Sequence, residues 1–496
     1  MPEFRAASTI PTWADSLPGA VLVALVIGCA TAPLALLVPI PLLAAAVAAL
    51  AVVIPVCLHP PLAAYLLITL TPLLAGLERS SLIPLVRPHE ALAILVGGGL
   101  ALNGVGRLLS GEVRRPRVRV MDAAILLMAF TGSVLPLLWL LARGQTPTQD
   151  DVLYALTFWK YYVVFLIVRL AVSGMGQVMR CLVLSMATGC IVALVAVLQA
   201  LQLLGVAEMV SRLYPPEDPS GATVGRGSAT LDSSAAVGDI MAYNLAIALA
   251  LLLRGSQRRG PLGLIASVFF FGGLASGQFS GAIAVAVSVA VVAALTGRLR
   301  QLAVVMLPAS LLAAVVLWPV ISTRLSGFDS TTGLPQSWDA RLINLRTYIW
   351  PELFSHHSYL LGVRPAARIA SPESWTDYIY IESGYTWLLW VGGVPLLIAY
   401  VIFVVVAARQ AVRVAHRDTD ERAVAGIAAA AALACTVVLM AVDPHLVLRG
   451  AADLLFALLA LTTASEAFSI STNQTGPAIG VSSDTEEGIS SATEDR

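Results

Sequence analysis

The sequence has few charged side chains for its length. Only 12% of its 496 residues are charged, whereas soluble domains carry about 25%. Lys160 is the only lysine, and 30 basic residues balance 30 acidic ones. This composition excludes an ordinary soluble globular protein. Because no basic groove with interleaved aromatic residues is present, we expect no nucleic-acid partner.

Residues that bind metals or carry redox chemistry are also scarce. The five cysteines all lie in apolar runs and lack metal-ligand or redox spacing, so they are typical of small core residues. The sequence contains no HExxH, P-loop, GxSxG or DxD pattern. We therefore predict that the protein uses no metal ion and no cofactor.

Long apolar runs dominate the chain instead. Hydrophobic residues make up 58% of it and the mean hydropathy is +0.84. Runs near the length that crosses a bilayer predict an all-α, polytopic transmembrane helical bundle with about fourteen spans, twelve to fourteen being compatible with the pattern. The predicted spans are 17–34, 38–58, 61–77, 89–109, 121–142, 153–172, 180–204, 236–253, 261–276, 281–296, 302–322, 381–407, 423–442 and 447–465.

Arginine positions predict the orientation, because basic residues accumulate in short cytoplasmic loops. With fourteen spans, the arginine clusters around 110–120, after 253, after 296 and within 408–422 fall on one side together with both termini. We expect a cytoplasmic N-terminus at 1–16, a transmembrane domain at 17–465, and a disordered cytoplasmic tail at 466–496, where apolar periodicity is absent.

The long polar stretch 323–380 between spans 11 and 12 falls on the opposite, extracytoplasmic side. Long loops in compact proteins are usually either functional or disordered. This one is rich in tryptophan and tyrosine, which is atypical of disorder. We therefore expect a folded cap over a membrane-embedded site.

The cap contains the strongest candidates for chemistry. Arg341 and Arg346 could bind an anion, since guanidinium groups match phosphate oxygens. In a regular helix they would lie about 140° apart, so one of them is a better candidate than both. Glu382 stands where the cap re-enters the membrane, and a carboxylate there is either paired or functional. It is the candidate general base.

Weaker candidates have structural explanations of equal weight. Arg226 begins a glycine- and hydroxyl-rich loop that suits an anion or a flexible connector, and Asn244 suits substrate contact or helix packing. Lys160 lies among interfacial aromatics, so it either reaches the headgroups or pairs with a phosphate. His356 and His357 could contact sugar or exchange protons, but no metal-ligand spacing accompanies them.

Several strings in 205–407 resemble the O-antigen ligase and O-antigen polymerase superfamily of bacterial membrane glycosyltransferases. The carrying features are the Arg226-Gly-Ser-Ala-Thr-Leu-Asp-Ser run, the short spans that meet at Ser276-Gly-Gln-Phe-Ser-Gly281, Arg341-Leu-Ile-Asn-Leu-Arg-Thr-Tyr-Ile-Trp350 with His357-Ser-Tyr-Leu-Leu-Gly-Val363, and Glu382-Ser-Gly-Tyr-Thr-Trp-Leu-Leu-Trp-Val-Gly-Gly-Val394. The family's arginine looks like Arg341, and Arg346 is an additional one.

The chain departs from the family pattern at two places. Ligases usually have His-Asn where this chain has Glu382 and Ser383, and Glu-Ser looks more like the polymerase branch. Many members have Ser-Arg near the short-span junction, where this chain has Gln278, Phe279 and Ser280. An arginine role at the junction therefore does not carry over.

The resemblance implies a metal-independent, inverting glycosyl transfer on the outer face of the bacterial plasma (inner) membrane. The donor would be a polyprenyl-diphosphate-linked glycan and the acceptor another glycan, with polysaccharide assembly and export proteins as expected partners. Together with the chemistry above, the catalytic residues we expect are Arg226 and Arg341 on the diphosphate, with Arg346 beside them, and Glu382 as the base. Substrate-binding roles are expected for His356, His357, Lys160, Asn244 and Tyr385.

Two alternatives remain open from the sequence. The first is a polysaccharide or lipid-linked oligosaccharide transporter or flippase, which the number of spans also suits. Against it, charge gathers at the outer end of the spans and the two halves show no obvious repeat. The second concerns the reaction: a ligase would transfer glycan to a lipid or protein, whereas a polymerase would extend a glycan.

Overall fold

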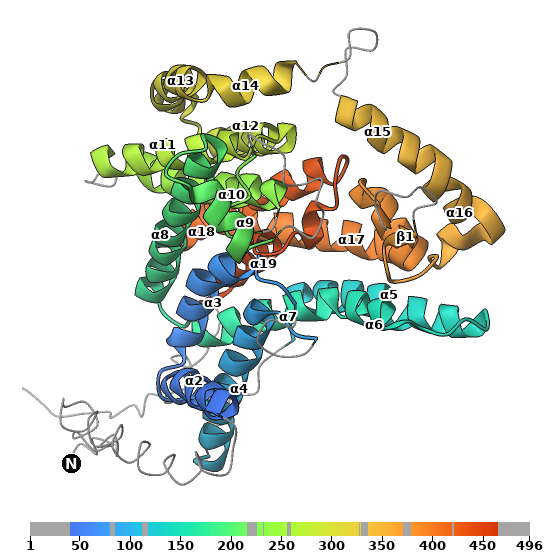
Figure 1. The fold of residues 1–496 in the computed structure, drawn as a ribbon. Helices are drawn as coiled ribbons and strands as arrows, with labels where there is room; N and C mark the ends of the chain where they lie inside the picture. The colour runs from blue at the N-terminus through green and yellow to red at the C-terminus, as the bar shows by residue number, and fades with distance from the viewer. Residues whose placement is uncertain are drawn as a thin grey trace, which may run out of the picture.

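The computed structural model describes residues 40–79, 85–111, 118–215, 226–231, 233–254, 259–326, 328, 336–370, 378–418 and 421–464. The predicted N-terminal segment 1–16, the first span 17–34 and the tail 466–496 lie outside these ranges. Within them the chain is an all-α polytopic protein with one short hairpin (Figure 1).

The helices that form the bundle are α2 (Ile40–Leu58), α3 (Pro61–Leu74), α4 (Pro88–Leu109), α5 (Val120–Ala142), α6 (Gln149–Ala155), α7 (Thr157–Ala171), α8 (Met175–Ala200), α9 (Val206–Leu213), α10 (Ser234–Leu253), α11 (Arg259–Ala275), α12 (Phe279–Thr296), α13 (Leu299–Val316), α14 (Trp318–Leu325), α17 (Gly384–Arg417), α18 (Glu421–Leu439), η5 (His445–Val447) and α19 (Ala451–Leu461). Between α14 and α17 lie α15 (Gln336–Asn344), η3 (Leu345–Ile349), α16 (Trp350–Phe354), η4 (Ser355–Leu360), β1 (Arg368–Ala370) and β2 (Tyr378–Tyr380).

In the described part of the chain, nine helices are long and apolar enough to cross a membrane, and four further apolar helices are shorter. Each predicted span from 38–58 onward coincides with a helix, but two differ from the prediction. The predicted span 302–322 breaks at Leu317 into α13 and α14, and 153–172 divides at Leu156 into α6 and α7. Helix α6 begins at Gln149, ahead of this break, where the Thr148 side chain accepts the N–H of Asp151.

Helix α10 lies in the middle of the bundle, among α8, α11, α12 and α18 (Figure 1). Small residues allow this close approach. A Cβ built on Gly238 would lie 2.8 Å from the Cα of Gly281, so the two backbones touch where α10 meets α12. Inside α10, Asn244 accepts a hydrogen bond from Ser185 of α8 at 2.8 Å. The centre of the fold is therefore a tightly packed helix that bonds to its neighbours.

Contacts near the loops show which segments lie at each end of the bundle. At one end Arg254 donates to Ala415 O, Arg422 donates to Thr462 O, and Arg119 donates to Thr463 O. At the other end the backbone N–H of Gly76 donates to Thr230 O, and that of Gly384 donates to Met440 O. Arginines of the predicted cytoplasmic loops thus share one end, and the segment 336–370 lies at the opposite end.

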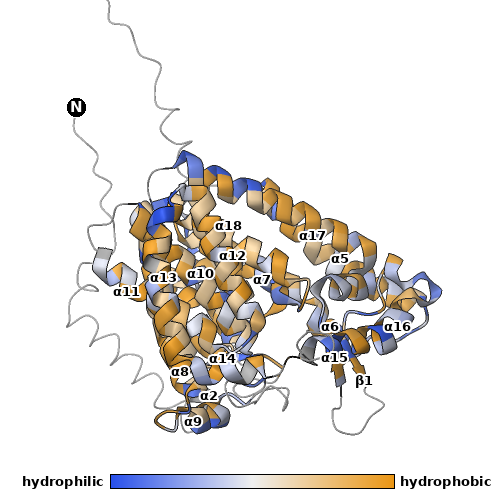
Figure 2. Ribbon diagram, turned by 90° about the horizontal axis from the view of Figure 1, so that it is seen from above, coloured by the Kyte–Doolittle hydropathy of each residue, from blue (hydrophilic) through white to orange (hydrophobic). Residues whose placement is uncertain are grey.

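The described part of the predicted cap is 323–326, 328, 336–370 and 378–380, and it contains the end of α14, the helical elements α15, η3, α16 and η4, and a hairpin. Its ribbon mixes hydrophilic and hydrophobic residues, whereas the ribbons of the bundle helices are mostly hydrophobic (Figure 2). Arg364 forms a fork with Asp151, with Nε–Oδ1 3.0 Å and Nη2–Oδ2 2.6 Å, and Arg143 donates to Val363 O. The indole of Trp390 donates to Ala366 O at 3.2 Å. The cap is therefore fixed to α6 and α17.

The cap packs against a kink in α17 at Gly393. Gly393 has φ 64° and ψ −158°, a conformation that only glycine adopts readily. A Cβ at this position would lie 2.5 Å from Leu360 O. A Cβ built on Gly362, whose φ is +92°, would lie 2.7 Å from Val391 O. The last two sequence stretches that carry the family resemblance, His357–Val363 and Glu382–Val394, therefore pack against each other.

We expect Gly393→Ala to lower the free energy of unfolding by about 2–4 kcal/mol, because it adds both backbone strain and a clash with the Leu360 carbonyl. The measurement is thermal or denaturant unfolding of the purified protein in detergent. Gly104→Ala is the matched control, since Gly104 lies inside α4 with nothing within 4 Å of its Cβ position. Equal stability of both variants would contradict the role of the kink.

Candidate active site

Arg341 and Glu382 meet at the end of the bundle that carries the cap. The Nε of Arg341 lies 3.2 Å from Oε1 of Glu382, and its Nη1 donates to Val442 O at 2.9 Å. Its Nη2 lies 3.8 Å from Oδ2 of Asp443. The side chains are 21%, 33% and 24% exposed for Arg341, Glu382 and Asp443. One guanidinium thus joins α15, the start of α17 and the turn after α18.

Local structure places Glu382 at this point. Ser383 is the N-cap of α17 and accepts a bond from the N–H of Thr386. The N–H groups of Gly384 and Tyr385 donate to Met440 O, and a Cβ on Gly384 would lie 2.4 Å from the Met440 sulfur. Glycine is needed for this approach, so the start of α17 lies directly against the turn that carries Asp443.

A second acid–base pair lies beneath this group. His445 Nδ1 is 2.8 Å from Oδ2 of Asp239 in α10, and both side chains are 0% exposed. Burial alone would lower the pKa of His445, but the Asp239 carboxylate, its hydrogen bond and Asp443 raise it above the usual value of 6.5. Among the described residues, Asp239 Oδ1 and His445 Nε2 have no hydrogen-bond partner. The pair anchors the turn holding Asp443 to the central helix.

Helix α15 extends from the Arg341 group to the junction between α11 and α12. Trp338 at its start packs edge-to-face on Phe279, the first residue of α12, with ring centroids 6.5 Å apart. Next to Phe279, the amide of Gln278 donates to Ser234 Oγ at the start of α10 at 2.9 Å. The candidate site therefore draws on α10, α12, α15, α17 and the turn after α18.

The remaining predicted cap residues lie outside this group. Arg346 is exposed, whereas Arg341, in the same helical stretch, is half-buried. His356 and His357 are exposed, have φ 49° and 56°, and show no described contact with Arg341 or Glu382. The His357 ring packs against Tyr359 instead. Of the two arginines, the structure brings only Arg341 to Glu382.

The predicted residues within the helices have packing partners. Lys160 Nζ lies 2.6 Å from Glu90 Oε1, and Tyr385 Oη donates to Val437 O at 2.7 Å. Asn244 is 1% exposed, bonds to Ser185 and donates to Ile240 O. These contacts tie helices together, which is the structural explanation for each residue.

Arg226 lies at the ends of α8 and α11. The N–H of its neighbour Gly227 donates to Ala275 O, and a Cβ on Gly227 would lie 2.5 Å from Ala196 O. None of the described contacts joins Arg226 to Arg341. The described contacts therefore place Arg226 beside α8 and α11 and do not bring it to Arg341 or Glu382.

Sequence reasoning missed Asp443 and His445. Both stand in the short polar turn Val442-Asp-Pro-His-Leu446 between two apolar runs. The signal was the one that singled out Glu382: an ionisable side chain at the mouth of a span is costly unless it is paired or used. Asp239, inside an apolar run, gave the same signal more strongly.

The arrangement can support acid–base chemistry around an anion. Arginine has five N–H donors, and Nε and one Nη of Arg341 are engaged by Glu382 and Val442, so donors remain for a phosphate oxygen. Glu382 is partly exposed and can reach a ligand. Among the described residues there is no group of three or more His, Cys, Asp or Glu that could hold a metal ion.

We expect His445→Ala to lower the free energy of unfolding by about 3–5 kcal/mol, because Asp239 is left buried without its partner. The double variant Asp239→Asn/His445→Gln keeps a neutral hydrogen bond and should recover most of this loss. His416→Ala, at the exposed end of α17, is the control. A His445→Ala protein as stable as the control would contradict the anchoring role.

The same pair sets a pH dependence. Because the folded-state pKa of His445 is raised, its stabilising contribution is fully present below the unfolded value and is lost as pH rises through the folded value. Unfolding midpoints measured across this range should fall with pH in the wild type. The double variant should lack this component.

Comparisons with known proteins give no match for this chain: no protein-family model matches it, and neither do curated proteins or solved structures.

Proposed function

We propose that this protein is a membrane glycosyltransferase that transfers or polymerises polyprenyl-diphosphate-linked oligosaccharide units. In this proposal it is inverting and metal-independent, and it acts on the outer face of the bacterial plasma membrane. The donor is a polyprenyl-diphosphate-linked glycan and the acceptor is a hydroxyl of a second glycan. The Glu382-Ser383 pair favours the polymerase reaction over ligase transfer.

One observation carries the proposal. Arg341 and Glu382 come from separate motifs of the resemblance, and their side chains lie 3.2 Å apart. A cation that can bind a leaving diphosphate and a carboxylate that can accept a proton therefore share one partly exposed place. Glycosyl transfer from a lipid diphosphate needs both groups within reach of one substrate.

The proposed reaction assigns a role to each group. Glu382 accepts the proton of the acceptor hydroxyl, whose oxygen attacks the anomeric carbon of the donor sugar. The bond between that carbon and the phosphate oxygen breaks, and the diphosphate leaves with the electron pair. Inversion follows because attack and departure occur on opposite faces. Arg341 offers its remaining donors to the departing diphosphate.

Asp443 and Arg226 complete the proposal. Asp443, with Val442 O, orients the Arg341 guanidinium, so it is a positioning residue. The trio of Arg341, Glu382 and Asp443 carries two negative charges against one positive. A diphosphate therefore needs further cations, and Arg226 is proposed to supply one from the α8 and α11 side, with Arg346 as a more distant contributor.

The membrane arrangement belongs to the same proposal. We assign about fourteen spans, both termini to the cytoplasm, and the cap 323–380 to the outside. The separation of the two bundle ends supports it, because the arginine-rich loops that contact one another through Arg119, Arg254 and Arg422 all lie opposite the cap.

We expect Glu382→Gln to reduce polymer formation by about 10²–10⁴-fold, since it removes the base while keeping the shape. Arg341→Lys should cost about 10²-fold, because lysine cannot reproduce the forked contacts. The measurement is the glycan ladder formed by membranes of cells that carry only the variant. Glu352→Gln, an exposed carboxylate in the same cap, is the matched control and should retain the ladder.

Three outcomes distinguish the alternatives. A full ladder from Glu382→Gln would overturn the base assignment. Loss of attachment with intact polymer would indicate a ligase. Retention of lipid-linked units on the cytoplasmic leaflet in cells lacking the protein would indicate a flippase.

The orientation has its own test. In a cysteine-free background, Ser355→Cys in the cap should react with a membrane-impermeant maleimide added to intact cells. Ser110→Cys, in the loop after α4, should react only after the cells are opened. The reverse pattern would place the candidate site on the cytoplasmic side. That would contradict the proposal, which places the donor in the outer leaflet.

A further inference from the structure

The hairpin of β1 and β2 has two faces of different composition. In its register Arg368 pairs with Tyr380 and Ile369 pairs with Ile379. Residues directly opposite each other share a face of a sheet, so the isoleucines lie on one face and Arg368, Tyr378 and Tyr380 on the other. Ile379 is 8% exposed, whereas Tyr378 is 44% exposed. The isoleucine face therefore packs on the protein, and the face with the two tyrosines is the more exposed one.

One guanidinium holds the aromatic rings of this face together. The Arg368 Cζ lies 5.7 Å from the centroid of the Tyr378 ring and 5.9 Å from that of Tyr380. It lies 5.8 Å from the ring of Tyr154 in α6, and all three distances are typical of cation–π contacts. Asp150, one turn before Tyr154 in α6, is 3.9 Å from Nη1 of Arg368. The hairpin and α6 thus lie side by side (Figure 2), and we call these five residues the tyrosine surface.

The exposed face of β2 continues to Glu382. Tyr378, Tyr380 and Glu382 are exposed or half-buried, while Ile379 and Ile381 between them are buried. Alternation of this kind places every second side chain on one side of an extended chain. Two extended residues span about 7 Å, so Tyr380 and Glu382 are neighbours on that side. The tyrosine surface therefore adjoins the proposed base.

This composition fits a saccharide. The face of an aromatic ring carries partial negative charge, and the C–H groups on one side of a sugar ring carry partial positive charge, so the two stack. The sugar hydroxyls need polar partners at the edge of the rings, which Arg368 and Asp150 provide. A phosphate fits less well, because Asp150 and Glu382 would repel it. A lipid tail fits less well because it would desolvate these charges.

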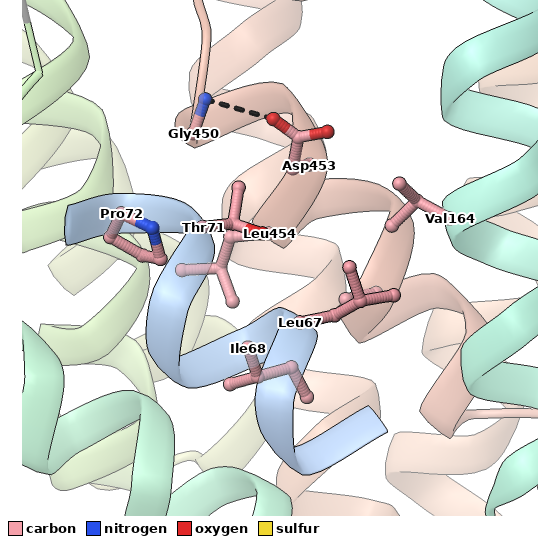
Figure 3. Close-up of a pocket in the computed structure, with 9 residues that line it drawn as sticks. Leu67, Ile68, Thr71, Pro72, Val164, Gly450, Asp453 and Leu454 are labelled. Carbon is pink, nitrogen blue, oxygen red and sulfur yellow. Dashed lines mark hydrogen bonds between the residues drawn. The ribbon is translucent and has the colours of Figure 1, made fainter. Parts of the chain in front are cut away.

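The pocket among α3, α7 and α19 is no alternative place for a sugar (Figure 3). Leu67, Val164 and Leu454 form part of its apolar wall. Its free space of about 10 Å³ is close to that of a single water molecule. A sugar ring is much larger, so it requires an open surface such as the one beside Glu382.

We propose that the tyrosine surface binds the acceptor glycan, with sugar rings stacked on Tyr378 and Tyr380 and the reactive hydroxyl at Glu382. The assignment to the acceptor rests on the proposed function, in which Glu382 takes the proton of the acceptor hydroxyl. Binding of a saccharide does not itself depend on that reaction. Arg368 fixes the rings before the ligand arrives, which lowers the entropic cost of binding.

The test is isothermal titration calorimetry on the purified full chain in detergent. The probe is the oligosaccharide released by mild acid from the polyprenyl-linked glycans of cells that carry the protein, and polyethylene glycol of similar length is the blank. The wild type should bind the oligosaccharide saturably. Tyr378→Leu should weaken binding about tenfold, because leucine keeps apolar bulk but has no flat ring face. Tyr378→Phe keeps the ring and should bind within about twofold of the wild type.

Phe354→Leu is the matched control. Phe354 is an aromatic residue of the same cap, 58% exposed, and it is not part of the tyrosine surface, so this variant should bind like the wild type. With the same oligosaccharide supplied as acceptor to membranes, Tyr378→Leu should raise KM about tenfold and leave kcat nearly unchanged. Glu382→Gln should bind the oligosaccharide but fail to extend it.

The proposal is overturned if the wild type shows no saturable binding at millimolar oligosaccharide, if Tyr378→Leu binds normally, or if Phe354→Leu loses binding equally. It is also overturned if Tyr378→Leu lowers kcat without changing KM, because the hairpin would then only position Glu382. Failure of the proposed function looks different: Glu382→Gln would keep the full ladder while Tyr378→Leu still lost binding.

Discussion

The lack of water in the membrane interior is the constraint on which this structure depends. Polar side chains there must find partners within the protein, because the hydrocarbon offers none. The chain meets this requirement with pairs that join helices far apart in sequence. Arg169 contacts Asp122, Lys160 contacts Glu90, and His445 contacts Asp239. Each pair joins two segments that are far apart in the sequence.

The same constraint explains where chemistry can occur. Many arginines at the cap end serve the structure: Arg364 forms its fork with Asp151, and Arg143 bonds to Val363 O. Arg368 lies near the rings of three tyrosines, Tyr154, Tyr378 and Tyr380. Arg341 lies between two partly exposed carboxylates, Glu382 and Asp443, and keeps donors for a ligand. The number of outer arginines is therefore a poor guide to an anion site, and their partners are a better one.

The cap and the candidate site are mechanically connected. Leu360 and Gly362 press against the kink of α17 near Gly393, and the first residues of the same helix hold Glu382 in place. The turn after α18 receives Arg341 from the cap on one side and is anchored to α10 through His445 on the other. The described part of the cap therefore packs against the same helix and the same turn that hold Glu382 and Asp443.

Sequence by itself determined the helical class, the approximate positions of the spans, and the grouping of arginine loops at one end, because hydrophobic length and charge are local properties. It also selected Arg341 and Glu382, since polar residues stand out at the mouths of apolar runs. It did not reveal the break at Leu317, the partners of Lys160 and Asn244, or the part played by Asp443 and His445. Only the tertiary structure decided these, because burial and pairing depend on which distant helix comes to lie alongside, and no local pattern records that neighbour.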